Sequence, residues 1–276
     1  GMDRYYQIAK CFRDEDLRAD RQPEFTQVDL EMSFVTEEDV YELLEGYVVG
    51  LWKKILGVEI TAPFRRLSYQ EAMRRFGSDK PDLRIPFEIR DVAAAFEGSS
   101  FAPFQSLLAG GGVIRTIAVP GGAAWSRKQC EDVAAAGKKL GAPDVAFFQI
   151  KEGALKGPLA KYLDDEHKAQ FLEMAQAQDG DAVFLIANVD AMLVATVLGQ
   201  LRLDVAKAHG LVREGWEFLW VTNFPLLEWS PDENRWVATH HPFTQPNPED
   251  LPYLESDPAR CGSRTYDLVL NGIEVG

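Results

Sequence analysis

The chain has 276 residues, of which 46% are hydrophobic and 26% are charged, and its formal net charge is −14 at pH 7. This composition is typical of a globular protein, and no apolar run approaches the ~20 residues that span a bilayer. The three cysteines are too scattered to indicate a disulfide framework or a thiolate zinc site, so we expect a protein of the reduced cytoplasm without membrane association.

Two strand-like runs enclose a highly charged loop near the start of the chain. Residues 5–12 are rich in aromatic and β-branched side chains. The second run alternates, with Val28, Leu30, Met32 and Phe34 on one face and Gln27, Asp29, Glu31 and Ser33 on the other. Arg13 stands where the first strand enters the loop, and its planar, permanently charged guanidinium suits a phosphate group. On this chemistry alone, nucleotide binding and a solvated surface hairpin are equal alternatives.

The next segment predicts two helices. Thr36 and Asp39 form a capping-box pattern, which predicts a helix that begins there and continues to about Leu56. A shorter helix is expected over residues 69–76. The Gly, Ser, Asp and Pro residues of positions 77–84 indicate a turn after it.

Residues 86–212 have a different pattern, in which short strands alternate with helices. Strands are predicted over 113–119, 145–150 and 183–187, and helices over 126–140, 164–177 and 190–209. This alternation indicates an α/β or α+β unit with its own core. The glycine clusters at 110–112 and 121–122 lack the spacing of a phosphate-binding loop, so we interpret them as ordinary loops.

The remaining residues predict mostly strands. One strand is expected over 218–224, a tryptophan-rich hairpin over 229–236, a proline-rich connection over 242–258, and a closing strand over 266–275.

Residues 11–34 closely resemble motif 2 of the class II aminoacyl-tRNA synthetases, in the form found in bacterial-type aspartyl-tRNA synthetases. Four further stretches match the same family in the same order: residues 77–84, 119–122, 240–243 and 266–276. The resemblance covers essentially the whole chain and implies an α+β fold, in which an antiparallel catalytic sheet is interrupted by an α/β insertion domain. It places the catalytic domain at 1–85 and 213–276 and the insertion domain at 86–212. Because motifs 1 and 3 and the anticodon-binding domain are not found here, we expect the middle of a larger enzyme.

The resemblance also implies roles for individual residues in ATP-dependent activation of L-aspartate and transfer to tRNA(Asp). Arg13 would be the catalytic residue, bridging the α-phosphate and the aspartate carboxylate. The expected groups are Arg13, Glu15, Gln22, Phe25 and Glu274 for ATP; Arg13, Gln27, Asp29 and His240 for aspartate; Arg18 and Arg21 for the tRNA acceptor end; and Asp267 and Glu274 for Mg²⁺.

Simple strand geometry bears on two pairs of residues. Asp267 and Glu274 are seven residues apart, so on one regular strand they would face opposite sides, and their shared role requires a break, most naturally at Gly272. His240 and His241 are adjacent on an extended segment, so they point apart and make a poor metal-chelating pair.

Three alternative functions remain open at this point. The enzyme of the resemblance, expected to be a homodimer, would be either specific for tRNA(Asp) or non-discriminating and also able to charge tRNA(Asn). A synthetase-like asparagine synthetase would keep ATP and aspartate without using tRNA. A non-catalytic tRNA-binding module is disfavoured by the ATP and magnesium groups, and the net charge of −14 argues against a broad basic surface for nucleic acid.

Overall fold

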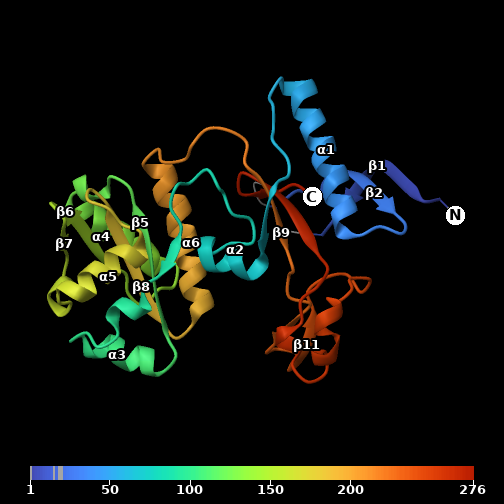
Figure 1. Ribbon diagram of the computed structural model, residues 1–276. Helices are drawn as coiled ribbons and strands as arrows, with labels where there is room; N and C mark the ends of the chain where they lie inside the picture. The colour runs from blue at the N-terminus through green and yellow to red at the C-terminus, as the bar shows by residue number, and fades with distance from the viewer. Residues whose placement is uncertain (1, 15, 18–20) are drawn as a thin grey trace. The chain divides into compact units, whose positions relative to one another are not determined.

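The computed structural model describes residues 2–14, 16–17 and 21–276. The chain divides into two compact units, Gly1–Arg65 and Arg66–Gly276, and Figure 1 shows the elements of each. The domain boundaries predicted at 85/86 and 212/213 do not coincide with this division and stay predictions. Within the described ranges, no helix combines the length and the apolar character that crossing a membrane requires.

The first unit begins with the predicted hairpin. Strands β1 (Arg4–Phe12) and β2 (Glu24–Met32) pair antiparallel over their whole length, from Arg4 opposite Met32 to Phe12 opposite Glu24. The prediction that the strand continues to Phe34 is wrong. Phe34 has a left-handed backbone (φ 61°) and a fully exposed side chain, because the chain turns there toward the following helix.

That helix is α1 (Glu37–Leu56), which has the predicted capping box at its start and the predicted end. The Asp39 carboxylate accepts a hydrogen bond from the Thr36 backbone N–H at 2.7 Å, which satisfies an amide at the helix start. At the other end, Gly57 adopts the left-handed conformation of a C-cap. The buried Glu45 carboxylate accepts the backbone N–H of Phe64 at 3.1 Å, which ties the segment after the helix back to it.

The second unit contains a four-stranded sheet with the order β13-β12-β9-β3. Its strands are β3 (Arg65–Ser68), β9 (Phe218–Thr222), β12 (Tyr266–Leu270) and β13 (Ile273–Glu274). Helix α2 (Tyr69–Phe76) has the predicted limits and begins at the side-chain cap Ser68, and Ala72 and Phe76 join the apolar core of this sheet. Leu219, Val221 and Val269 complete that core from the strands.

The expected single strand over residues 266–275 is wrong, because it is a hairpin. Asn271 (φ 52°) and Gly272 (φ 85°) form a two-residue turn, and Val269 pairs with Glu274 across it. Two consecutive left-handed residues are the requirement of a tight hairpin turn, which Asn-Gly meets at low cost. The break anticipated at Gly272 is therefore confirmed, and it reverses the chain.

Most of the middle segment forms a five-stranded sheet with the order β4-β5-β8-β6-β7. The strands are β4 (Ile89–Asp91), β5 (Val113–Val119), β6 (Ala146–Lys151), β7 (Ala154–Lys156) and β8 (Ala182–Asn188). Every neighbouring pair is antiparallel, so this part is of the α+β type and the expected α/β type is wrong. Short strands β4 and β7 were not predicted.

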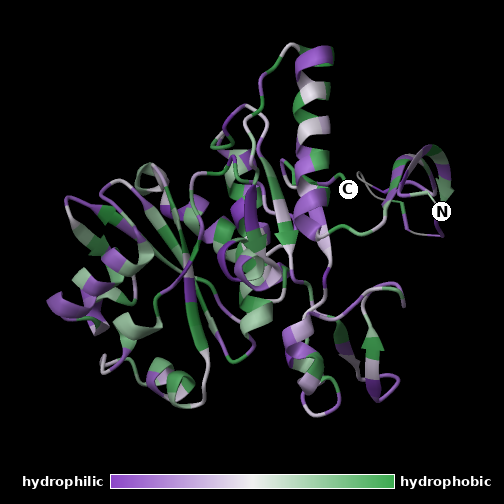
Figure 2. Cartoon of the chain, turned by 45° about the vertical axis from the view of Figure 1, so that its right-hand side comes forward, coloured by the Kyte–Doolittle hydropathy of each residue, from purple (hydrophilic) through white to green (hydrophobic). Residues whose placement is uncertain are grey.

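Helices cover both faces of this sheet. They are α3 (Ala102–Ala109), α4 (Arg127–Lys139), α5 (Asp165–Ala175) and α6 (Ala191–Ala208). Alternate strand residues divide between two cores: Phe184 and Ile186 pack with α4 and α6, whereas Val183 and Leu185 pack with α5. In Figure 2 the central strands are largely hydrophobic, whereas hydrophilic residues recur along the flanking helices. The helix α3 was not predicted, and the other three were.

The remaining elements are short. A hairpin of β10 (Leu227–Ser230) and β11 (Arg235–Ala238) includes the predicted tryptophan pair, with ring centroids 5.7 Å apart. The 3₁₀ turns are η1 (Ala93–Phe96), η2 (Gly122–Ala124), η3 (Ala160–Tyr162), η4 (Pro248–Tyr253) and η5 (Pro258–Arg260).

Helices α2 and α6 meet at a pair of glycines. A Cβ atom on Gly77 would lie 2.0 Å from the carbonyl oxygen of Ala195, and one on Gly199 would lie 2.6 Å from the carbonyl oxygen of Phe76. The two backbones are therefore in direct contact. Gly77 also needs its left-handed φ of 66° to end α2, so two separate constraints select glycine there.

Candidate functional site

One face of the β1–β2 hairpin gathers the predicted substrate residues. Alternate residues of the two strands share this face and pair across it as Gln7 with Asp29, Ala9 with Gln27, and Cys11 with Phe25. The functional side chains thus come from β2, and two of their three partners on β1 are small. Small partners leave open space above the strand, which is what a bound ligand requires.

Hydrogen bonds orient the polar groups of this face. Gln7 Nε2 donates to Asp29 Oδ2 at 3.0 Å, and Cys11 Sγ donates to Gln27 Oε1 at 3.1 Å. A donor from Gln7 holds the carboxylate in one orientation and leaves its other oxygen for a ligand. Sequence reasoning missed Gln7, because its place opposite Asp29 depends on the hairpin register.

The loop end of the hairpin brings Arg13 and Phe25 together. The Arg13 backbone N–H donates to the carbonyl oxygen of Pro23 at 2.9 Å, and its guanidinium carbon lies 5.2 Å from the centre of the Phe25 ring. A cation and an aromatic face at this distance attract each other, and both suit a nucleotide. Arg21 is half-buried and Gln22 is exposed, both just before β2, whereas the predicted Glu15 and Arg18 lie outside the described residues.

In the second unit, the β12–β13 turn places Asp267 and Glu274 on one face of the four-stranded sheet. Asp267 and Val269 are two residues apart, and Val269 pairs directly with Glu274, so all three point to the same side. The turn thus removes the conflict that a single regular strand would create between the two carboxylates. Val221, the residue opposite Asp267 on β9, lies on the same face and is fully buried. The burial of this face changes the pKa of Asp267.

The surroundings of Asp267 favour its neutral form. Burial raises the pKa of Asp267 to about 7, and the nearby carboxylates of Glu274 and Asp79 contribute to this rise, while Lys80 opposes it. Lys80 Nζ lies 3.7 Å from Glu274 Oε2. Asp79 and Lys80 belong to the matched stretch 77–84, but no role was predicted for them. Crowded carboxylates of this kind are the groups that a cation stabilises.

The donor set suits a magnesium ion that arrives with phosphate groups. Among the described residues, no group of three or more histidine, cysteine, aspartate or glutamate side chains is arranged to hold a metal by itself. Magnesium is commonly bound by one or two carboxylates, with substrate phosphates and water as its other ligands. Asp267 and Glu274 supply that number of hard oxygen donors.

His240 has a buried nitrogen with no protein partner within the described part of the chain. Its Nε2 accepts and donates no hydrogen bond there, and its ring packs edge-on against Phe224 at 5.8 Å. Burial lowers the pKa of His240, and the carbonyl of Pro225 partly opposes this shift. A carboxylate ligand beside Nε2 would restore the proton. The adjacent His241 packs against Phe243 at 4.5 Å.

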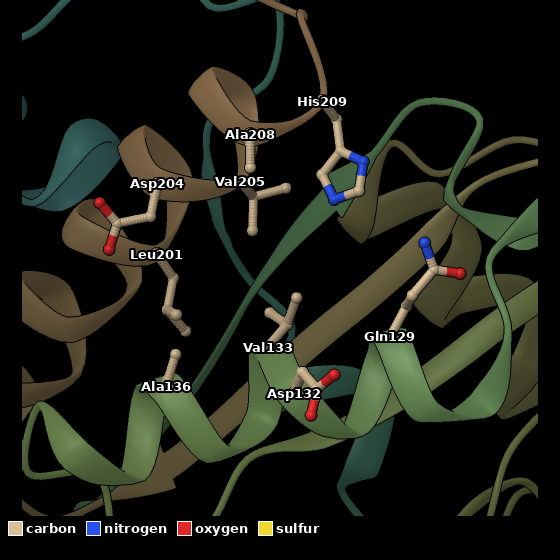
Figure 3. A pocket seen from close by; sticks show the side chains of 9 residues that line it. All are labelled: Gln129, Asp132, Val133, Ala136, Leu201, Asp204, Val205, Ala208 and His209. Carbon is tan, nitrogen blue, oxygen red and sulfur yellow. The ribbon is translucent and has the colours of Figure 1, made fainter.

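A cavity of about 270 Å³ lies elsewhere, between helices α4 and α6 (Figure 3). Figure 3 shows Val133, Leu201 and Val205 between the two helices, with Asp132 and Asp204 at the edges. None of the predicted site residues lines it. Its volume is below the range of about 300–1,000 Å³ that is usual for ligand clefts, so it is not the candidate site.

Comparison with known proteins identifies the family of the chain. Two similar proteins are the aspartate–tRNA(Asp/Asn) ligases of Caldanaerobacter subterraneus subsp. tengcongensis, 48% identical over 277 residues, and of Desulfatibacillum aliphaticivorans, 48% identical over 278 residues. The aspartate–tRNA ligase of Clostridium acetobutylicum is 45% identical over 278 residues. Each alignment covers all of this chain and 46–47% of the relative, so the chain spans about half the length of the curated relatives it matches. Residues 1–276 match the family of class II tRNA synthetases (D, K and N), and the chain belongs to that family.

Proposed function

We propose that this chain carries the adenylate-forming site of an aspartate–tRNA ligase, which activates L-aspartate with ATP and transfers the aspartyl group to tRNA(Asp). One observation carries the proposal. The hairpin register sets Arg13 and Phe25 at the loop end of one strand face and Gln27 and Asp29 farther along the same face. A nucleotide and an amino acid bound along that face would meet in the order that adenylate formation requires. The names of the similar proteins support the same substrates.

Each hairpin residue has a role that its chemistry permits. Arg13 would bridge the α-phosphate and the aspartate carboxylate, because a guanidinium offers several fixed donors and keeps its charge at the transition state. Phe25 would stack on adenine. Asp29, held by Gln7, would receive the ammonium group, and Gln27 would bond the amino acid above the space left by Ala9. Positioning of this kind contributes most of the catalysis in a phosphoryl-transfer step.

Residues of the second unit would bind the magnesium ion and recognise the side chain of the substrate aspartate. Asp267 and Glu274 would hold a magnesium ion together with the ATP phosphates, and such an ion neutralises phosphate charge. His240 would bind the side-chain carboxylate of aspartate through Nε2, which has no hydrogen-bond partner among the described residues, and would become protonated in doing so. Glu15 and Gln22 remain proposed ATP contacts.

The proposal extends to the complete protein. Arg18 and Arg21 would meet the tRNA acceptor end, and because the chain is acidic overall, most phosphate affinity would come from other parts of the protein. A cytoplasmic location is supported by Cys11, Cys130 and Cys261, which are all free thiols. The proposed homodimer rests on the family resemblance.

Aspartate-dependent exchange of pyrophosphate into ATP tests the proposal in the complete protein. We expect Asp29→Asn to lower kcat/KM for aspartate by about two orders of magnitude, since a charged hydrogen bond contributes roughly 1.5–3 kcal/mol. The matched control is Lys10→Ala, which removes a charge from the opposite face of the same strands and should leave exchange unchanged. Equal activity in the parent and Asp29→Asn would show that the hairpin face is not part of the site.

The same preparation separates the alternatives. Charging of purified tRNA(Asp) and tRNA(Asn) distinguishes a specific enzyme from a non-discriminating one. The similar proteins include both aspartate–tRNA(Asp/Asn) ligases and an aspartate–tRNA ligase. Formation of asparagine from aspartate, ATP and ammonia without tRNA would instead identify an asparagine synthetase.

A further inference from the structure

Arg202 is a buried arginine on helix α6, and it contacts a distant loop. Only 1% of its surface is exposed. Its guanidinium donates to three backbone carbonyls of that loop: Nε to Phe87 at 2.6 Å, and Nη2 to Asp82 at 2.9 Å and Ile85 at 3.2 Å. The guanidinium carbon also lies 5.0 Å from the centre of the Phe76 ring. Burial of a charged guanidinium carries a high desolvation cost, and these hydrogen bonds to the carbonyls offset it.

A second arginine takes the neighbouring carbonyls of the same loop. Arg213 Nη2 donates to Leu83 at 2.9 Å, and its Nε and backbone N–H donate to Arg84 at 3.2 and 3.1 Å. Of the six carbonyls from residue 82 to residue 87, two arginines therefore bind five. Arg202 differs from Arg213 in being buried, so its contacts are not shared with solvent.

The other side of this loop lies against the β12–β13 turn. A Cβ atom on Gly272 would lie 3.2 Å from the Cβ of Asp82, so the turn and the loop are in van der Waals contact. Just before Asp82, Lys80 Nζ reaches Glu274 Oε2 at 3.7 Å, and the charge of Asp79 acts on Asp267. Asp82 itself is held by Arg84, which donates to its carboxylate at 2.7 and 3.0 Å. The loop thus lies between Arg202 and the carboxylate pair.

We propose that Arg202 is a positioning residue for the Asp267–Glu274 pair: by fixing the backbone of residues 82–87 from helix α6, it sets where the loop supports the β12–β13 turn. The inference rests on the proposed use of that pair to hold magnesium with ATP. Helix α6 follows β8, the last strand of the middle segment, and precedes β9 of the four-stranded sheet. Through Arg202, the middle segment would therefore help to position the proposed metal site.

The test compares Arg202→Lys and Arg202→Met with the control Leu198→Ala in the complete protein. Leu198 is a fully buried residue on the same helix, so its truncation weakens the α6 core while the hydrogen bonds from Arg202 to the loop carbonyls are kept. We expect Arg202→Lys to raise the Mg²⁺ concentration for half-maximal pyrophosphate exchange about tenfold, the lower end of the range for residues that orient metal ligands. Arg202→Met should raise it further, and KM for aspartate should stay at the parent value. Leu198→Ala should leave the Mg²⁺ midpoint unchanged.

A second readout does not depend on activity. Amide hydrogen exchange, measured by mass spectrometry without ATP or Mg²⁺, should become faster in residues 268–276 of Arg202→Lys and not in those of Leu198→Ala. If Arg202→Met does not fold, Arg202→Lys alone carries both measurements. Unchanged exchange rates and Mg²⁺ midpoints in Arg202→Lys, or equal changes in Leu198→Ala, would overturn the inference. If the parent shows no aspartate-dependent exchange, the proposed function fails, and the amide measurement still decides the role of Arg202.

Discussion

Replacement of Gly77 by alanine tests the contact between helices α2 and α6. The new Cβ would lie 2.0 Å from the carbonyl oxygen of Ala195 and 2.8 Å from the Cα of Gly199, against a usual contact distance near ~3.5 Å. Both atoms are backbone, so a whole helix must move by about 1.5 Å to relieve the overlap. Overpacking of this kind costs about 1–3 kcal/mol.

The left-handed backbone of Gly77 adds a second cost. At φ 66°, a Cβ costs about 1–2 kcal/mol. Gly121 provides the control, because it has a similar φ of 74° and no contacting atom of the described residues lies within 4 Å of the place that its Cβ would take. We therefore expect Gly77→Ala to lower the free energy of unfolding by about 3 kcal/mol and Gly121→Ala by about 1 kcal/mol.

Urea unfolding followed by circular dichroism measures both variants. The gain from restricting the unfolded chain is the same for each glycine, so the difference between the variants isolates the helix contact. Equal losses in the two variants would refute the close approach of α2 and α6.

Three further predictions follow from single contacts. Gln7→Met should raise KM for aspartate about three- to tenfold without changing KM for ATP in pyrophosphate exchange, because Asp29 loses one orienting hydrogen bond; an unchanged KM would show that Gln7 has no such role. The Asp164 carboxylate and the Glu97 carbonyl raise the pKa of His167. The contribution of this side chain to the free energy of unfolding is therefore fully present below about pH 6.5 and is lost as pH rises through the folded-state pKa. The unfolding free energies of parent and His167→Gln should thus differ more at low than at high pH, and a pH-independent difference would contradict this. Phe148→Ala should cost about 3–5 kcal/mol in urea unfolding, because the ring is fully buried between β6 and α5, and a loss below about 1 kcal/mol would count against that packing.

Elements with local signals were predictable from the sequence. Helix α2 has the predicted limits because Ser68 caps its start and Gly77 ends it, and both signals are local. Helix α3 was missed because Phe101 offers no side-chain cap. Strands β4 and β7 have three residues each, too few to show a period. The Asn271–Gly272 pair does carry a recognised hairpin signal, so the prediction of a break at this point understated what the sequence indicates.

The site was predictable where one strand carries it. Gln27 and Asp29 follow from the alternation of β2, whereas Gln7 needs the pairing register and Asp79 needs the approach of a loop to β12. Arg202 had no local signal. Its carbonyl partners are 115–120 residues away in sequence, and on a helix an arginine is ordinarily a solvated residue.

The arginine contacts of the loop bear on how this protein can be divided for engineering. A cut at residue 86 would separate Arg202 from the Asp82 and Ile85 carbonyls and leave it with Phe87 alone. The excised segment would then contain the buried Arg202 cation without most of its hydrogen-bond acceptors, which would strongly destabilise its core. Any graft or deletion of the middle segment should therefore take residues 77–85 with it. The cassette that can be exchanged between proteins is longer than the sequence pattern indicates.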